Sequence, residues 1–220
     1  MRIEGCIFDL DGVIVDTARY HFQAWRKMAQ LFGGDLTHEQ NETLKGVSRM
    51  ASLDYILKEN GIEKSLEEKK ELARKKNEWY LDLIDELDES EMLPGVLDLI
   101  KELHDKDILI GLGSASKNAI TILKKLGIDH YFKTMVDGNS VEKSKPNPEV
   151  FIKGVNGLGI DPAHCIVFED SSKGIAAANT GGFIPIGIGN PEYLHEAVKV
   201  YSGFEDLHFE MILKDLAEKS

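Results

Sequence analysis

The sequence is poor in cysteine. Only Cys6 and Cys165 occur among 220 residues, and each lies in a short apolar segment. We expect both to be buried core residues, because free cysteine is among the most buried residue types. Their separation matches neither the close ligand spacing of a metal site nor a redox pair. A chain of this length also buries enough apolar surface to fold without disulfide staples.

Long apolar runs are also missing. No stretch approaches the roughly 18 apolar residues that a membrane-spanning helix needs. The first residues, MRIEGCIFDLDG, carry acids at once and contain too short an apolar run for a signal peptide. We therefore expect a cytoplasmic protein without a membrane partner. Repeats and low-complexity tracts, which indicate repeat architectures or disorder, are absent as well.

Positive charge is in short supply. The chain has 26 Lys and Arg against 38 Asp and Glu, which gives a formal net charge of −12. This balance disfavours nucleic acid and anionic membranes as partners. If the protein binds an anion, it must gather Lys, Arg or a metal cation at one place.

Short apolar runs alternate with segments of helical periodicity. Helices are expected at residues 95–106, 117–126, 148–158 and 172–181. Strands separated by such helices are typical of βαβ units, so we predict an α/β fold: a Rossmann-like parallel sheet with helices on both faces. The expected strands are Cys6–Phe8, Ile108–Leu112, Thr134–Val136, Cys165–Phe168 and Phe183–Ile188.

Residues 16–90 break this alternation, because they contain helical patterns and no strand candidate. The clearest pattern, over residues 71–88, places Trp79 and Tyr80 in the core of this unit. We predict two domains. Residues 1–15 and 91–220 form the sheet domain, and residues 16–90 form an all-helical cap inserted after the first strand.

Four polar clusters follow expected strands. Asp9 and Asp11 come after the first strand, and the segment Ser114-Ala115-Ser116-Lys117-Asn118 after the second. The loop with Lys145 precedes a helix, and Glu169-Asp170 follows a strand. Each has a plain alternative, such as a loop acid, a helix N-cap or a solvated surface loop.

The coincidence of these clusters is more informative than any one of them. Ligands of open α/β sheets bind outside the carboxyl ends of the strands, where all four clusters are expected. The acids suit a nucleophile and a hard cation. Hydroxyl groups and N–H groups at a helix start suit phosphate, and a lysine adds fixed positive charge. Together these groups predict phosphoryl transfer.

The same residues resemble the four motifs of the haloacid dehalogenase-like hydrolase superfamily. They are Asp9-Leu10-Asp11-Gly12-Val13 with Asp16-Thr17, then Ser114, Lys145 and Glu169-Asp170. The helical insertion is similar to the cap domain of that superfamily. Cap residues, above all the segment Lys45-Gly46-Val47-Ser48-Arg49, resemble those of members that interconvert β-D-glucose 1-phosphate and D-glucose 6-phosphate.

The resemblance implies an Mg²⁺-dependent phosphomutase acting through β-glucose 1,6-bisphosphate. Asp9 would be the nucleophile and Asp11 the general acid and base, with a pKa raised toward neutrality. One Mg²⁺ per chain would bind Asp9, the Asp11 carbonyl, Asp170 and Glu169. The implied substrate and phosphate ligands are Thr17, His21, Trp25, Lys45, Gly46, Val47, Ser48, Arg49, Ser52, Lys76, Asn77, Ser114, Ala115, Ser116, Lys117, Asn118 and Lys145.

Plainer interpretations remain open for several residues. Trp25 fits a cap core, His21 an exposed helix face, Thr17 a helix cap and Lys76 a solvated position. Two other functions also remain open: a sugar-phosphate phosphatase with the same acids, and a non-catalytic module that binds phosphosugars or metal. We expect a monomer whose partners are small sugar phosphates.

Overall fold

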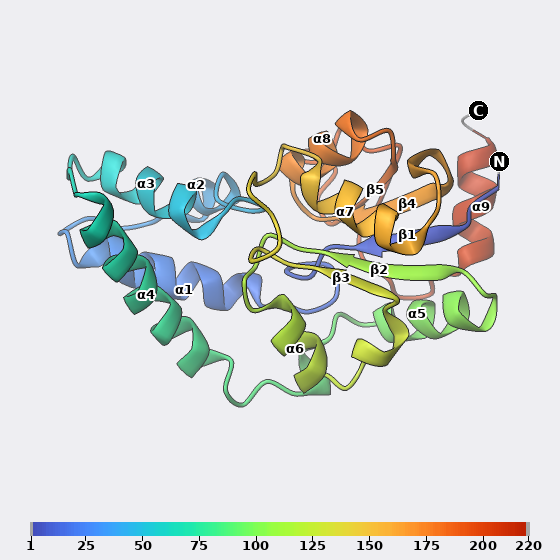
Figure 1. Cartoon of the computed structure of the whole chain (residues 1–220), viewed down its shortest axis with the longest axis horizontal. Helices are drawn as coiled ribbons and strands as arrows, with labels where there is room; N and C mark the ends of the chain where they lie inside the picture. Colours follow the sequence, from blue (N-terminus) through green and yellow to red (C-terminus); the bar gives the residue numbers. More distant parts are fainter. Residues whose placement is uncertain (1, 219–220) are drawn as a thin grey trace.

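The computed structural model describes residues 2–218, and its core is one parallel six-stranded sheet (Figure 1). The strand order is β3-β2-β1-β4-β5-β6. The predicted α/β fold is confirmed. The strands are β1 Gly5–Phe8, β2 Leu109–Gly113, β3 Thr134–Val136, β4 Cys165–Glu169, β5 Ile184–Ile188 and β6 Lys199–Tyr201. The short strand β6 was not predicted.

The register brings the polar clusters to one edge of the sheet. Phe8, the last residue of β1, lies opposite Leu112 of β2 and Phe168 of β4. All three strands run in the same direction, so Asp9, Ser114 and Glu169 follow within one or two residues of this level. The sheet itself therefore assembles residues that lie up to 160 positions apart, counted from Asp9 to Glu169.

Both faces of the sheet are buried under helices, which explains why its strands are apolar runs rather than alternating ones. Ile7 packs with the cluster beneath α7 and α8, whereas Cys6 and Phe8 pack into the larger cluster on the other side. Cys6 and Cys165 are both free and buried, as predicted. The covering helices are α5 Val96–Asp105, α6 Ala119–Lys125, α7 Glu149–Leu158, α8 Ser172–Thr180 and α9 Phe209–Ala217.

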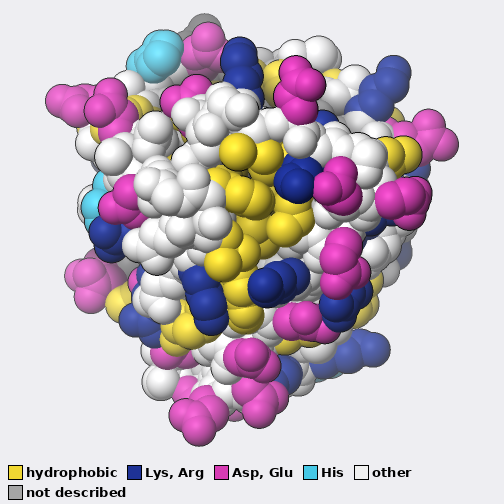
Figure 2. Space-filling view, turned by 90° about the vertical axis from the view of Figure 1, so that its left-hand side faces the viewer, with side chains coloured by type: hydrophobic (Ala, Val, Ile, Leu, Met, Phe, Trp, Pro, Cys, Tyr) yellow, Lys and Arg dark blue, Asp and Glu magenta, His cyan; other side chains and the backbone are white. Residues whose placement is uncertain are grey.

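Four helices form a separate unit between β1 and α5, at the left of Figure 1. They have their own apolar cluster, which includes Trp25, Met28 and Leu53. On the outer face of this cap an apolar strip is bordered by Lys and Arg side chains (Figure 2). The helices are α1 Ala18–Gln30, α2 His38–Glu42, α3 Arg49–Glu59 and α4 Leu66–Leu83.

The long cap helix differs from its prediction at both ends. It begins at Leu66 because Ser65 and Glu68 form a capping box, and it ends at Leu83 rather than at residue 88. Tyr80 belongs to the cluster of the sheet domain rather than to the cap core, and Trp79 packs against both clusters. The domain limits at residues 15 and 91 stay a prediction. No helix within residues 2–218 is long and apolar enough to cross a membrane.

Candidate active site

A cleft of about 730 Å³ separates the cap from the carboxyl edge of the sheet. Both parts of the chain contribute to its walls, so neither makes the site alone. The residues lining it are Asp9, Asp11, Ala18, His21, Trp25, Asn41, Leu44, Lys45, Gly46, Val47, Arg49, Ser52, Lys76, Ser114, Ala115, Ser116, Lys117 and Asp170.

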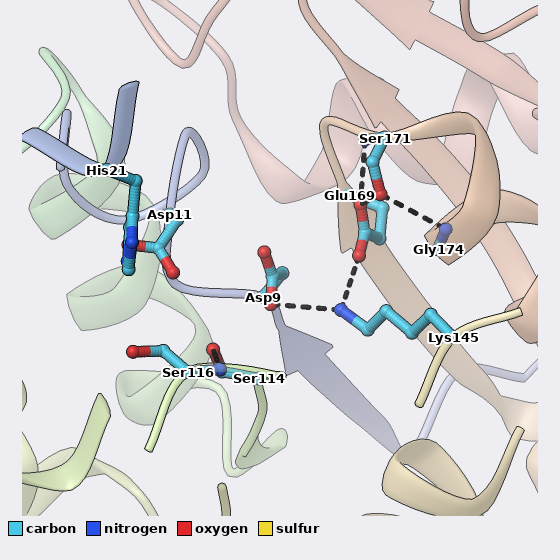
Figure 3. Close-up of polar contacts among 9 residues, drawn as sticks. All are labelled: Asp9, Asp11, His21, Ser114, Ser116, Lys145, Glu169, Ser171 and Gly174. Atoms are coloured by element: carbon cyan, nitrogen blue, oxygen red, sulfur yellow. Dashed lines mark hydrogen bonds and ion pairs between the residues drawn. The ribbon is translucent and has the colours of Figure 1, made fainter. Parts of the chain in front are cut away.

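Asp9 and Glu169 are bridged by one buried lysine. Lys145 Nζ lies 3.0 Å from Asp9 Oδ1 and 2.5 Å from Glu169 Oε1, and all three side chains are buried (Figure 3). The second Glu169 oxygen accepts from the N–H and hydroxyl of Ser171, each at 2.8 Å. Ser171 Oγ in turn accepts from Gly174 N at 3.1 Å. These bonds hold the first turn of α8 and the lysine in fixed positions behind Asp9.

The two bridged carboxylates and a third, that of Asp170, lie close together. Oxygens of Asp9, Glu169 and Asp170 lie within 4.8 Å of one another. Burial raises the pKa of Asp9, although Lys145 opposes this shift. Burial also raises the pKa of Asp170 to about 7, against the lowering effect of Lys45. A divalent cation with a preference for oxygen ligands fits this donor set, because it would offset the charge that burial penalises.

The Asp11 carboxylate is not part of this group. It accepts a short hydrogen bond from Thr17 Oγ1, and its Oδ1 lies 3.5 Å from His21 Nε2. Burial raises the pKa of Asp11, but the charge and hydrogen bond of His21 and the bond from Thr17 more than compensate, so the pKa is lowered. The expectation of a raised pKa is therefore wrong for this arrangement, in which two donors hold the ionised form.

Lys76 reaches this acid through His21. Its Nζ lies 2.7 Å from His21 Nδ1 and 4.7 Å and 4.8 Å from the ring centroids of Trp25 and Tyr80. Only 1% of Lys76 is exposed, so the solvated interpretation is wrong. Burial, followed by the nearby Arg49, lowers the pKa of Lys76 well below its usual value. His21 also stacks on Tyr80, with ring centroids 4.0 Å apart.

Hydroxyl groups and N–H groups line the opposite wall. Ser114 is buried, and its Oγ accepts from Ser116 N at 3.1 Å. Ser116 Oγ accepts from Asn118 N at 3.3 Å, so the turn before α6 is held by its own side chains. Helix α6 begins at Ala119 rather than at residue 117, which leaves Lys117 in this loop.

Arg49 stands at the cap side of the cleft, as the first residue of α3. Neither Arg49 nor Lys117 forms an ion pair with any carboxylate among residues 2–218. Burial lowers the pKa of Arg49. Two cations without an acidic partner at one end of a cleft favour an anionic ligand there.

Further polar contacts join cap and core around the cleft. Lys45 Nζ lies 3.1 Å from Asp170 Oδ2 and 3.2 Å from Glu42 Oε2. Two other contacts are Lys173 Nζ to Thr43 O at 2.6 Å and Asn118 Nδ2 to Asn77 Oδ1 at 3.0 Å. The cap is therefore seated against the sheet domain.

Most residues that the resemblance implied line this cleft. Four of the implied residues do not line it, namely Thr17, Asn77, Asn118 and Glu169, while Ser48 and Lys145 line a smaller cavity. Sequence reasoning missed Ala18, Asn41 and Leu44 as lining residues. Ala18 and Leu44 adjoin the implied residues Thr17 and Lys45, which is a usable signal. Asn41 carries no such signal, because it depends on how α2 sits over the sheet.

Known proteins resemble this chain over most of its length. Residues 6–187 match the family model described as haloacid dehalogenase-like hydrolase. The chain is 39% identical to a β-phosphoglucomutase of Bacillus subtilis (strain 168), over 96% of this chain and 94% of that protein. It is 34% identical to a fructose-1-phosphate phosphatase of Escherichia coli (strain K12), over 82% of this chain and 94% of that protein.

The fold has a counterpart among solved structures. A crystal structure of a β-phosphoglucomutase from Clostridium difficile superposes with a TM-score of 0.94 at 44% identity, covering 98% of both chains. The resemblance inferred from the motifs is thus confirmed, both for the superfamily and for the β-phosphoglucomutases within it. The chain belongs to the haloacid dehalogenase-like hydrolases.

Proposed function

We propose that this enzyme is a β-phosphoglucomutase, which interconverts β-D-glucose 1-phosphate and D-glucose 6-phosphate through β-glucose 1,6-bisphosphate. The observation that carries the proposal is a cleft with a place for phosphate at each end. Asp9 and Asp170 line it on the side of the sheet domain, with Lys145 bonded to Asp9, and the cations Arg49 and Lys117, which have no acidic partner among residues 2–218, would form the second phosphate site. A bisphosphate needs both ends at once, whereas hydrolysis of a monophosphate needs only the first.

At the sheet end, an Asp9 oxygen would attack the phosphorus of the bound phosphate while the bond to the sugar oxygen breaks, which gives an aspartyl phosphate. Lys145 is fixed beside Asp9 and would hold a transferring phosphoryl oxygen; Ser114 lies on the same edge for a second one. Mg²⁺, held by Asp9, Glu169, Asp170 and the Asp11 carbonyl, would supply charge neutralisation between the two anions.

Asp11 would move the proton. In the return step its carboxylate takes the proton of the attacking sugar hydroxyl, and in the forward step the protonated acid gives it to the leaving oxygen. The bonds from Thr17 and His21 favour the ionised form of Asp11. A substrate oxygen that replaces one of these donors would therefore raise the pKa of Asp11.

At the cap end, Arg49 and Lys117 would bind the phosphate that is not reacting. The intermediate must exchange its two phosphates between the ends, because either one can be transferred. A second phosphate site distinguishes a mutase from a phosphatase. In a phosphatase, water rather than a sugar hydroxyl attacks the aspartyl phosphate.

The test is a product balance. Purified enzyme receives Mg²⁺, β-glucose 1-phosphate and a trace of bisphosphate, and glucose 6-phosphate and inorganic phosphate are followed together. We expect glucose 6-phosphate with little free phosphate, and neither product with Asp9→Ala. Free phosphate as the main product would contradict the proposal and favour the phosphatase, a function that one of the relatives carries.

Two variants add detail to this assay. Asp11→Asn should lose turnover, and a near-normal rate would exclude Asp11 as acid and base. Failure of Asp9 to form a complex with fluoroberyllate would favour a non-catalytic binding module. A cytoplasmic location, a monomeric state and sugar phosphates as partners belong to the same proposal.

A further inference from the structure

Each acid at the candidate metal site has a lysine partner, and the two lysines come from different parts of the chain. Lys145 belongs to the sheet domain and bridges Asp9 and Glu169. Lys45 belongs to the cap and pairs with Asp170 at 3.1 Å. Two ammonium groups thus face the acids that would bind a divalent cation.

The two lysines differ in whether they can leave. Lys145 and both of its acidic partners belong to the sheet domain, so movement of the cap does not by itself separate them. Lys45 lies between α2 and α3, with 25% of its side chain exposed, and it reaches Asp170 only while the cap is seated. Asp170 keeps only 9% of its side chain exposed under this contact.

A cation at the acid group and the Lys45 ammonium need the same carboxylate. Asp170 Oδ2 is the atom that faces Lys45, and Asp170 is one of the three acids whose oxygens converge. Two positive groups on one carboxylate repel each other at short range in a buried site. When Lys45 moves off Asp170 it keeps Glu42, 3.2 Å away on the cap itself, so the ammonium is not left without a partner.

We propose that the Lys45 ammonium pairs with Asp170 in place of the divalent cation. Metal binding and closure of the cap would then oppose each other in the absence of substrate. This inference rests on the proposed metal site. Without metal, the cap closes with Lys45 on Asp170. The metal-loaded enzyme without substrate stays more open, because the cation at Asp170 displaces Lys45, which is one of the groups that hold the cap.

Lys173 provides a matched control. Its ammonium also joins the cap to the core, through Thr43 O at 2.6 Å, two residues from Lys45 along the cap. It contacts none of the three acids of the metal group. Lys173→Met therefore removes a positive charge and one cap contact from the same neighbourhood without freeing Asp170.

The experiment measures cap position and metal affinity together, without sugar phosphate. Dyes on Glu63→Cys in the cap and Glu192→Cys in the core report their separation by energy transfer, since both positions are exposed and both native cysteines are buried. Mn²⁺ affinity is read by electron paramagnetic resonance. We expect metal to lower energy transfer in the wild type and in Lys173→Met, but not in Lys45→Met. Lys45→Met should also bind Mn²⁺ at least about fivefold more tightly than the wild type.

The outcomes separate this inference from the function on which it rests. A Lys45→Met variant with wild-type affinity, or one in which metal still moves the cap, would overturn the inference and leave the metal site intact. A wild-type enzyme that binds Mn²⁺ without a change in energy transfer would also overturn the inference. Equal Mn²⁺ affinity in the wild type and Asp170→Asn would show that Asp170 does not bind the metal. That result would contradict both the proposed metal site and the inference.

Discussion

Gly46 offers a sharp test of whether the cap must seat against the sheet domain during turnover. Its φ is +70°, a conformation that costs an alanine roughly 1 kcal/mol or more. A Cβ at this position would also lie 2.7 Å from Ser171 Oγ. The first cost applies whether the cap is seated or not, whereas the second applies only when it is seated.

The size of the second cost follows from how Ser171 is held. Its Oγ donates to Glu169 at 2.8 Å and accepts from Gly174 N at 3.1 Å, so it cannot turn aside without losing both bonds. Two such bonds contribute about 2 kcal/mol together, which corresponds to roughly 30-fold in the population of the seated cap. We therefore expect Gly46→Ala to lower kcat/KM by about that factor.

Gly61→Ala is the control for the backbone cost. Gly61 has a φ of +64°, and nothing lies within 4 Å of a Cβ there. It should lose about as much thermal stability as Gly46→Ala but keep its kcat/KM. In a Ser171→Ala background the hydroxyl is gone, so the effect of Gly46→Ala on kcat/KM should nearly vanish. Equal kcat/KM for the two glycine variants, or an additive cycle with Ser171→Ala, would refute the reasoning.

Three further predictions concern the charges of the cleft. Arg49→Ala should lower mutase turnover at least about 100-fold, while phosphorylation of Asp9 by acetyl phosphate, measured by intact mass, falls much less; equal losses would contradict its place at the non-reacting end. Lys76→Met should change the free energy of unfolding by less than about 1 kcal/mol in denaturant titrations, because an apolar side chain of similar volume replaces a buried ammonium. A loss of several kcal/mol would show that the contact between Lys76 and His21 stabilises the fold. Removal of divalent cations with a chelator should abolish turnover, and added Mg²⁺ should restore it; activity that persists would exclude the metal role.

The sheet could be predicted because its strands are continuous apolar runs ending in polar residues. Asp9, Ser114 and Glu169 were brought together by topology alone, since parallel strands end at one edge. Strand β6 escaped prediction because it has only three residues, all half-buried, at the margin of the sheet. The start of α4 could have been predicted correctly, because Ser65 and Glu68 have the spacing of a capping box.

The cap side of the site was harder to predict for a physical reason. Lys76 belongs to a charged stretch that also holds Arg74 and Lys75, and nothing local distinguishes the lysine that turns inward. Its burial comes from the packing of α4 against α1, which supplies His21 and Trp25 around it. The expected rise in the pKa of Asp11 was wrong because the sequence does not show that the Thr17 hydroxyl and the His21 ring contact its carboxylate.

The point where the chain enters the cap links this geometry to catalysis. Thr17 and His21, which contact the Asp11 carboxylate, lie six and ten residues after it, at the start of α1. The two connecting segments pair with each other through Asp16 N to Glu91 O at 3.1 Å and Leu93 N to Ile14 O at 2.9 Å. A cap that moves on this paired connection carries Thr17 and His21 with it. Movement of the cap on this connection would therefore change the distance from these two groups to the Asp11 carboxylate.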